Sequence, residues 1–307
     1  MEYIPSERIR KEKWKFYFVL FAWPLYLFLL PQVSRHLGLY TLFLMIFPGV
    51  YLFTWTGYLM HECWHKYVPN IPNKLFYHLF SWLLFTDPQI YNMLHGSHHM
   101  NVNTWEDTEF HPLGQIKNIH WRRLYNFLEI FLGVIFVTLI ALFTLPSNPK
   151  YKQKFKWSSL ITAIIAWIVL FGGLGYLAHI VFKINASQIA LSFTANMWLC
   201  SFILHHSQLV EHGNLIVNGS YQERNIKTRN MRNQGLIEKL FLFLTHGDSM
   251  EHVLHHTLVT VYSRPFPGKV PMPENAIYIG FKEYLSIVWE MLSLKNAEVQ
   301  TSKRVNM

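Results

Sequence analysis

Long apolar runs alternate with polar segments along this chain. The runs extend over Trp14–Leu30, Leu37–Met60, Leu124–Leu145, Trp157–Phe182 and Ile189–Leu204. A helix needs about 20 predominantly apolar residues to cross the hydrocarbon core of a bilayer. The pattern therefore predicts four transmembrane helices, at about residues 14–31, 37–60, 157–182 and 187–204.

Basic residues beside these runs predict the side of the membrane on which the polar segments lie. Cytoplasmic segments of membrane proteins carry an excess of Lys and Arg. The N-terminal segment is basic through Arg8, Arg10, Lys11, Lys13 and Lys15. The segment before the fourth run is basic through Lys150, Lys152, Lys154 and Lys156. Because both segments are expected in the cytoplasm, the third run is predicted to be a re-entrant or interfacial helix, and every histidine cluster is predicted to be cytoplasmic.

The composition also favours an integral membrane protein. Of the 307 residues, 51% are hydrophobic and 15% are charged, whereas ordinary soluble domains carry about 25% charged residues. The net charge of +9 favours an anionic lipid surface as partner, and no stripe of basic and aromatic residues indicates nucleic-acid binding. Two cysteines, Cys63 and Cys200, exclude a disulfide framework. Without internal repeats or a linker, residues 1–307 are predicted to form a single domain.

Most of the 17 histidines lie in four short stretches: HECWH at 61–65, HGSHH at 95–99, QLVEH at 208–212 and HVLHH at 252–256. Residues three and four apart share a face of a helix, so each stretch can point its imidazoles in one direction. These stretches supply the candidate metal ligands His61, His65, His95, His98, His99, His212, His252, His255 and His256. One zinc ion takes three or four ligands, whereas nine imidazoles suit two irons.

Acidic residues beside the stretches are candidates for a supporting role. A histidine that binds a metal usually donates its second ring N–H to a carboxylate. The candidates are Glu62, Glu106, Asp107, Glu211, Asp248 and Glu251. The remaining histidines carry no comparable spacing. His36, His78, His120 and His179 are interpreted as structural, while a metal role is left open for His111, His205, His206 and His246.

HECWH alone fits a second chemistry, the His-Glu-x-x-His signature of zinc proteases. Membrane proteases of that kind carry a later Asp-Gly pair that supplies the third ligand, and this chain has no such pair. A non-enzymatic receptor with degenerate histidine boxes is a further alternative, although no ligand position is missing here.

From about Thr54 to Gly268 the chain resembles the integral-membrane fatty acid desaturases and their relatives, the membrane alkane monooxygenases. His61 and His65 resemble the first histidine box, followed by Lys66 as in the alkane-hydroxylase branch. LHGSHHMNVNTWEDTEF resembles the second box, with desaturase spacing, and its acidic tail. QLVEHGNL is similar to the alkane-hydroxylase stretch that supplies a further ligand, here His212. EHVLHHTLVTVYSRPFPG resembles the third box and its Arg-Pro tail.

The resemblance implies an all-α integral membrane fold with about four transmembrane helices and a cytoplasmic helical cap that holds two irons. It implies O2-dependent oxidation of an unactivated C–H bond in a fatty acyl or alkyl chain. Desaturation is the expected reaction. Hydroxylation or oxidative decarboxylation at the same centre are the alternatives, because features of different branches are mixed. No catalytic residue beyond the metal ligands is predicted.

The implied partners are a lipid or fatty acyl substrate and a separate electron donor of ferredoxin, rubredoxin or cytochrome b5 type. The chain lacks a His-Pro-Gly-Gly haem-binding segment and the cysteine pairs of a fused ferredoxin. The expected location is a bacterial inner membrane or the endoplasmic reticulum.

A basic stretch is interpreted either as a solvated or lipid-facing surface or as a docking site for an acidic donor; it contains Arg224, Lys227, Arg229 and Arg232.

Overall fold

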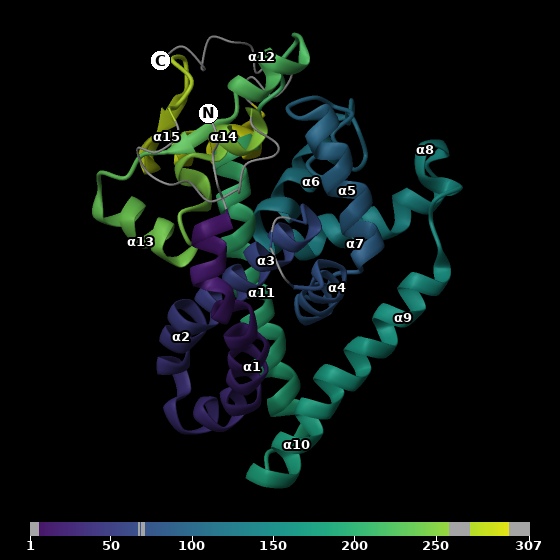
Figure 1. Ribbon diagram of the computed structural model, residues 1–307, viewed down its shortest axis with the longest axis vertical. Coiled ribbons are helices and arrows are strands. Elements are labelled where there is room, and N and C mark those ends of the chain that lie inside the picture. The colour runs from purple at the N-terminus through teal and green to yellow at the C-terminus, as the bar shows by residue number, and fades with distance from the viewer. Residues whose placement is uncertain (1–5, 67, 69–70, 258–270, 295–307) are drawn as a thin grey trace. The chain divides into compact units, whose positions relative to one another are not determined.

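The computed structural model of the chain is mainly helical (Figure 1), and it describes residues 6–66, 68, 71–257 and 271–294. The chain divides into two compact units. The first unit comprises residues 1–89 and 155–201, and the second comprises residues 90–154 and 202–307. The Arg-Pro tail of the third box, at residues 258–268, lies outside the described residues.

The first unit is built from long apolar helices. They are α1 (Ser6–Leu37), α2 (Thr41–Leu44), α3 (Tyr51–Trp64), α4 (Asn73–Leu83), α9 (Trp157–Trp167), α10 (Gly173–Phe182) and the first part of α11 (Ala186–His212). Short turns of other helix types connect some of them, at Gly38–Tyr40, Met45–Val50 and Ile168–Gly172.

The second unit has shorter helices and two short strands. Its helices are α5 (Pro88–Asn101), α6 (Ile119–Leu132), α7 (Val134–Thr144), α8 (Pro149–Lys152), the end of α11, α12 (Tyr221–Ile226), α13 (Leu236–Leu244), α14 (His252–Thr257) and α15 (Phe281–Ser293). The strands are β1 (Arg229–Met231) and β2 (Ile277–Ile279), and 3-10 turns lie at Leu145–Ser147 and Asp248–Met250.

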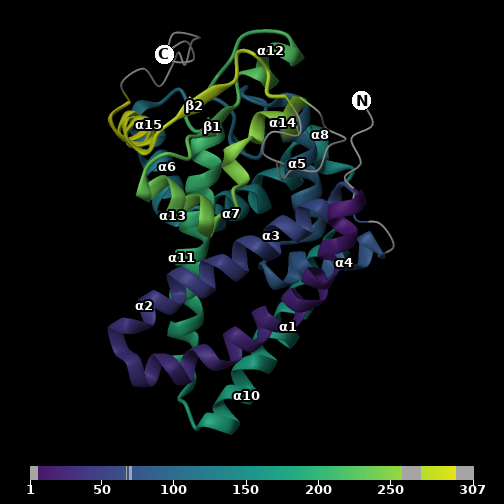
Figure 2. The ribbon, with the colours of Figure 1, turned by 60° about the vertical axis from the view of Figure 1, so that its left-hand side comes forward.

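Helices α1 and α3 form the two arms of an antiparallel hairpin (Figure 2). The ring of Phe18 lies 6.0 Å from that of Trp55, and the ring of Trp23 lies 5.8 Å from that of Phe53. The residue numbers therefore rise along one arm as they fall along the other. Near the turn, the Tyr26 hydroxyl donates a hydrogen bond to the Leu44 carbonyl at 3.1 Å. The apolar sequence from residue 14 to 64 thus folds back on itself.

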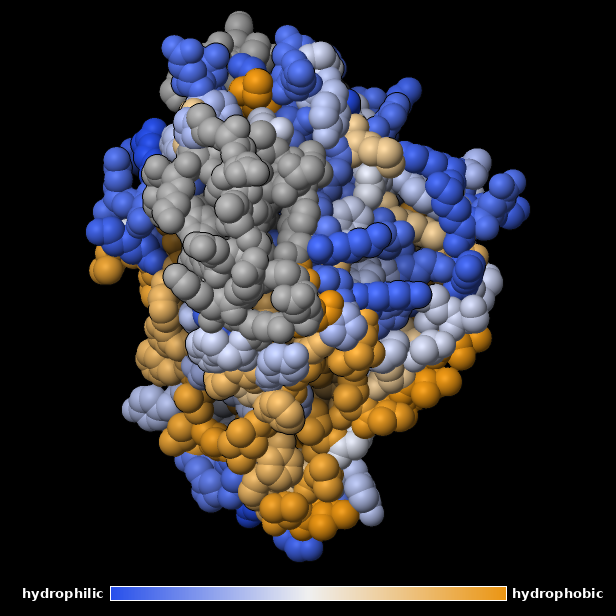
Figure 3. Space-filling view, in the orientation of Figure 1, coloured by the Kyte–Doolittle hydropathy of each residue, from blue (hydrophilic) through white to orange (hydrophobic). Residues whose placement is uncertain are grey.

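Three helical segments are long and apolar enough to cross a membrane: Trp14–Trp64, Trp157–Phe182 and Ala186–His212. The first has 51 residues, more than twice the length that one crossing needs. Apolar side chains also cover the outer surface of α9 and α10 (Figure 3), where Ile161, Ile165 and Val181 are exposed. Large apolar surfaces of this kind are rare on proteins that face water on all sides. The first unit is therefore suited to lipid surroundings.

The apolar run at Leu124–Leu145 is not one helix. It divides into α6 and α7 at Gly133, whose φ of 63° and ψ of −140° are conformations that essentially only glycine adopts. Helix α6 exposes mainly apolar side chains and buries several polar ones. Trp121 is 65% exposed and Phe127 is 47% exposed, whereas Asn126 and Glu129 are buried. An exposed apolar stripe opposite a buried polar face favours lipid, and not water, on the outer side of α6.

The two strands depart from the all-α prediction. β1 and β2 pair in parallel, with Arg229 opposite Ile277 and Met231 opposite Ile279. Both strands are only three residues long, and every residue of β1 is buried, so no alternation of polar and apolar residues marks it in the sequence. The sheet is part of the core of the second unit, which contains Ile130, Leu209, Val210, Leu215, Met231, Leu242, Ile277, Ile279, Tyr284, Ile287 and Met291.

Candidate metal centre

Helix α5 carries three histidines that point in two directions. Successive helical residues turn by about 100°, so His95 and His99 share one face while His98 is displaced by about 60° from His95. Helix α14 repeats this arrangement with His252 and His256 on one face and His255 displaced. Each H-x-x-H-H box can therefore serve two separate points in space.

The second unit uses this property to build two histidine groups. In the first group, Nε2 of His99 lies 3.0 Å from Nε2 of His95 and 3.1 Å from Nε2 of His255. The pair of α5 is thus joined by the displaced histidine of α14. In the second group the roles are exchanged: His98 of α5 joins His252 and His256 of α14, and His212 at the end of α11 is added.

The second group is equally tight. Nε2 of His256 lies 3.2 Å from Nε2 of His98 and 3.1 Å from Nε2 of His252, which in turn lies 3.2 Å from Nε2 of His212. All four candidate ligand atoms lie within 4.8 Å of one another, and all four residues are buried or nearly so.

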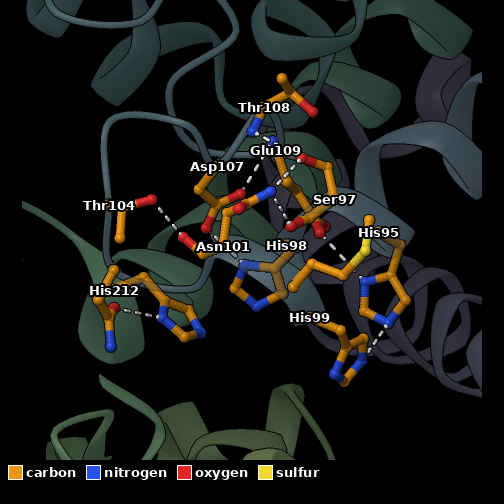
Figure 4. A network of polar contacts seen from close by, with 12 residues as sticks. His95, Ser97, His98, His99, Asn101, Thr104, Asp107, Thr108, Glu109 and His212 are labelled. Atoms are coloured by element: carbon orange, nitrogen blue, oxygen red, sulfur yellow. Dashed lines mark hydrogen bonds and ion pairs between the residues drawn. The ribbon is translucent and has the colours of Figure 1, made fainter. Parts of the chain in front are cut away.

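Hydrogen bonds fix which ring nitrogen carries the proton in three of these histidines. Nδ1–H of His98 donates to the Asp107 carboxylate at 2.7 Å, and Nδ1–H of His95 donates to the Glu109 carboxylate at 3.1 Å (Figure 4). Nδ1–H of His212 donates to the side-chain oxygen of Asn103 at 3.0 Å. A neutral imidazole has one proton, so Nε2 of each of these rings is left with a lone pair.

These lone pairs converge, and hydrogen bonding among the rings cannot satisfy them. Nε2 of His256 faces Nε2 of both His98 and His252, yet one ring nitrogen can donate or accept only one such bond in its plane. Nitrogens about 2.1 Å from a metal and at right angles lie about 3.0 Å apart, close to the spacings found here. The residues of both groups therefore fit a metal ion.

Burial favours the neutral form of two histidines in the second group, His252 and His256. It lowers the pKa of His252 to about 3 and that of His256 well below its ordinary value, and the charge of nearby His98 acts in the same direction. Burial would also lower the pKa of His98, but the charge and hydrogen bond of Asp107 outweigh it and raise that pKa. His252 and His256 are thus neutral near pH 7, as metal ligation requires.

His61 and His65 belong to the first unit and show the same convergence. They lie at the end of α3, one helical turn apart, with their Nε2 atoms separated by 3.2 Å. Nδ1 of His61 lies 3.4 Å from the buried carboxylate of Glu62. This pair offers two ring nitrogens in one direction.

The acidic candidates divide into those that touch a histidine and those that do not. Asp107 and Glu62 make the contacts described above, and a Glu211 oxygen lies 3.3 Å from Nε2 of His252. Asp248 lies with Glu211 and His252 in a further group of possible ligand atoms. Among the described residues, Glu106 and Glu251 do not contact a histidine of either group, and Glu106 is exposed.

Two supporting residues were not expected from the sequence. Glu109 holds His95, although Glu106 and Asp107 of the same acidic tail were named instead. Its position two residues after Asp107 is the signal that could have identified it. Asn103 holds His212 across a separation of 109 residues. No local pattern in the sequence indicates that contact.

Three further histidines, His111, His205 and His206, make contacts that suit structural roles. His206 bonds the Tyr284 hydroxyl and lies 3.2 Å from the Ile130 carbonyl. His205 lies 3.1 Å from the Gln208 amide oxygen and 3.4 Å from the Glu129 carboxylate. The ring of His111 packs 4.8 Å from that of Trp105, and burial lowers the pKa of His111 to about 4.

One residue of the basic stretch is not available to a partner. Arg229 is 4% exposed, and its guanidinium donates to the carbonyls of Leu209, Val210 and Gly213 at the end of α11. It provides hydrogen-bond donors to the carbonyls of that helix terminus, next to His212. Arg232 forms an exposed ion pair with Glu283 at 3.2 Å.

A comparison with protein families identifies the chain. The family model for fatty acid desaturases matches residues 35–264, which is more than half of the 307 residues. The chain belongs to the fatty acid desaturase family. The match includes all nine candidate histidines of this desaturase-family protein. No curated protein and no solved structure was found to match it. Membership implies a membrane oxidoreductase that acts on fatty acyl chains through a di-iron centre, and the histidine groups are able to hold metal.

Proposed function

We propose that this protein oxidises an unactivated C–H bond of a fatty acyl chain with O2 at two irons, and that it is a desaturase. The observation that carries the proposal is the crossed use of the two H-x-x-H-H boxes. Each box gives its two histidines that are four residues apart to one group and its middle histidine to the other. Two metals a short distance apart are the natural occupants of such an arrangement.

The proposed ligands of the two irons are the nine histidines. His98, His212, His252 and His256 hold one iron. His95, His99 and His255 hold part of the second set. His61 and His65, whose Nε2 atoms lie together, are the two remaining ligands that the resemblance to desaturases implies. This assignment uses every histidine of the four stretches and leaves His205, His206 and His111 to their structural contacts.

The two irons, when bound, would supply the oxidising power that removes hydrogen from an unactivated carbon. The chain's own residues hold the metals and keep their ligands oriented. Asp107 and Glu109 accept hydrogen bonds from Nδ1–H of His98 and His95, so that Nε2 stays free for the metal. The proposed sets consist of neutral imidazoles, which suit iron and leave positions open for O2.

Desaturation consumes O2, two electrons and two protons, and it releases two molecules of water with the alkene. Hydroxylation by the same centre would instead yield an alcohol and one water. Oxidative decarboxylation of a free fatty acid would yield a terminal alkene, CO2 and two waters. The ligand set is common to all three, so the distance between the reacting carbon and the metals decides the product.

We further propose that the protein crosses the membrane four times and acts as a single domain over residues 1–307. The hairpin of α1 and α3 would provide two crossings, with α9–α10 and α11 as the others. Helices α6 and α7 would lie in the interface or re-enter it. Basic residues at the N-terminus and at Lys150, Lys152 and Lys154 favour a cytoplasmic position for the histidine boxes. A separate electron donor of ferredoxin, rubredoxin or cytochrome b5 type would then reach them from that side.

The test is product analysis with purified protein in detergent or lipid, supplied with iron, a reducing system, O2 and fatty acyl substrates. Desaturation yields a product two mass units lighter than the substrate, and hydroxylation yields one sixteen units heavier. His255→Ala should abolish either product while the protein still inserts into membranes. Undiminished turnover by His255→Ala, or the absence of any oxidised product from the iron-loaded wild type, would contradict the proposal.

A further inference from the structure

We propose that Asn103 is a positioning residue for His212 and determines which of its ring nitrogens faces the metal. The inference rests on the proposed metal-binding function and deepens it, because it assigns a specific support to one ligand. Asn103 is 2% exposed and lies just beyond the end of α5. It is therefore part of the structure that connects the second histidine box to the end of α11.

The backbone of Asn103 is held in a conformation that suits asparagine. Its φ is 57°, in the left-handed region where asparagine is enriched over most other residues. Its carbonyl accepts a hydrogen bond from the Val217 amide at 2.8 Å. Because the backbone is fixed at this point, the side chain has a defined direction.

The amide group of Asn103 can face only one way. Its nitrogen donates to the Arg224 carbonyl at 2.8 Å and to the Thr228 hydroxyl at 3.2 Å. A backbone carbonyl only accepts hydrogen bonds, so the NH2 end must be on that side. The amide oxygen is thereby directed to Nδ1 of His212 at 3.0 Å. His212 must carry its proton on Nδ1, and Nε2 presents its lone pair beside Nε2 of His252.

Other side chains would not perform both tasks. An aspartate would accept the hydrogen bond from Nδ1–H of His212. It has no N–H to donate to the Arg224 carbonyl, however. A side chain without polar atoms would remove the hydrogen-bond partner of both the His212 ring and the Arg224 carbonyl. An amide satisfies an acceptor on one side and a donor on the other.

Asn103 also distinguishes His212 from His98 in the same group. His98 donates to the carboxylate of Asp107, whereas His212 donates to a neutral amide. A carboxylate increases the basicity of its histidine more than a neutral acceptor does. The backbone under His212 is fixed separately, because Arg229 donates to the Val210 carbonyl at 2.9 Å. Ring and backbone of this ligand are thus held by different residues.

The experiment compares Asn103→Gly with the wild type by titrating metal-free protein with 57Fe(II) under anaerobic conditions. Glycine accepts the left-handed backbone, so the variant removes the side chain and little else. One of two Fe(II) binding steps should weaken by about 10–100-fold, the usual effect of losing such a support, and the other step should be unchanged. Asn101→Ala is the matched control, because that amide bonds Ser97 and no histidine of either group among the described residues.

A second variant distinguishes an effect on the orientation of the His212 ring from a loss of protein stability. Asn103→Asp keeps an acceptor for His212, so it should retain both metals, with altered Mössbauer parameters at one iron only. The inference is overturned if Asn103→Gly binds both irons as the wild type does, or if it loses both to the same extent. A wild type that binds no iron would instead refute the proposed function itself, and the role of Asn103 with it.

Discussion

At the scale of single residues, the middle histidine of each H-x-x-H-H box is separated in function from the other two. His98 of α5 lies against His256 of α14, and His255 of α14 lies against His99 of α5. Each therefore belongs to the group whose paired histidines come from the other helix. The residue three positions on lies about 60° to one side of the first histidine and the residue four positions on lies about 40° to the other side, so these two histidines diverge by about 100°. The boxes are therefore better understood as two crossed ligand sets than as separate clusters.

The carboxylate of Asp107 is expected to matter through His98. Asp107→Asn should weaken iron binding by about 10–100-fold, because the His98 Nδ1 proton loses its charged acceptor. The measurement is the iron retained after graded challenge with a chelator. Glu106→Gln is the control, since this neighbouring side chain is exposed. Equal iron retention by the two variants would refute the role given to Asp107.

The buried histidines should make the metal-free protein sensitive to acid. The pKa of His252 is about 3 in the folded protein and about 6.5 in an unfolded chain. Below pH 6.5 the unfolded chain therefore binds a proton that the folded protein does not, and stability falls as the pH drops from about 6.5 towards 3. His252→Asn should show a shallower decline in melting temperature over this range. A slope equal to that of the wild type would contradict the assignment.

The sequence predicts which histidines are candidate ligands better than it predicts which residues form hydrogen bonds with them. Helical spacing is a local property, and it identifies nine residues whose ring nitrogens converge within each unit. Asn103 and His212 are far apart in sequence, and their contact depends on tertiary structure. Arg229 looks like a surface residue in the sequence, but it is buried against the end of α11.

At the scale of elements, the break between α6 and α7 depends on Gly133. A residue with a Cβ at this φ and ψ is strained, so Gly133→Ala should destabilise the protein by about 1–3 kcal/mol. Thermal unfolding in detergent measures the effect. Gly172→Ala is the matched control: its φ is −64° and an added Cβ would contact nothing within 4 Å. Equal melting temperatures for the two variants would show that the bend tolerates other residues.

The hydrophobic pattern predicts the apolar runs but not how each one folds. The flanking charges predict that the run from residue 124 to 145 is re-entrant or interfacial, but hydropathy does not mark its division at Gly133, because a glycine within an apolar run is common in membrane helices. Most exposed side chains of α6 are apolar, with His120 and Arg123 as exceptions, while its buried face contains Asn126 and Glu129. That reversal becomes visible only once burial is known. The same holds for β1, whose residues are all buried.

At the scale of the whole molecule, composition and hydropathy already indicate a membrane protein. Three apolar helical segments and the desaturase family match agree with that prediction. The family also explains why so many histidines occur in a chain with few charged residues. The choice among desaturation, hydroxylation and decarboxylation depends on where the substrate carbon lies, which no residue pattern in the sequence encodes.

The most direct test of the central claim is the metal content of the purified, detergent-solubilised protein, determined by elemental analysis after expression with added iron. Two irons per chain with little zinc are predicted, because the two crossed groups each require one metal. Iron must be supplied during expression, since zinc binds imidazole sites more tightly than iron and can replace it. One zinc and no iron, even with iron supplied, would contradict the di-iron account and favour the zinc chemistry that HECWH alone allows.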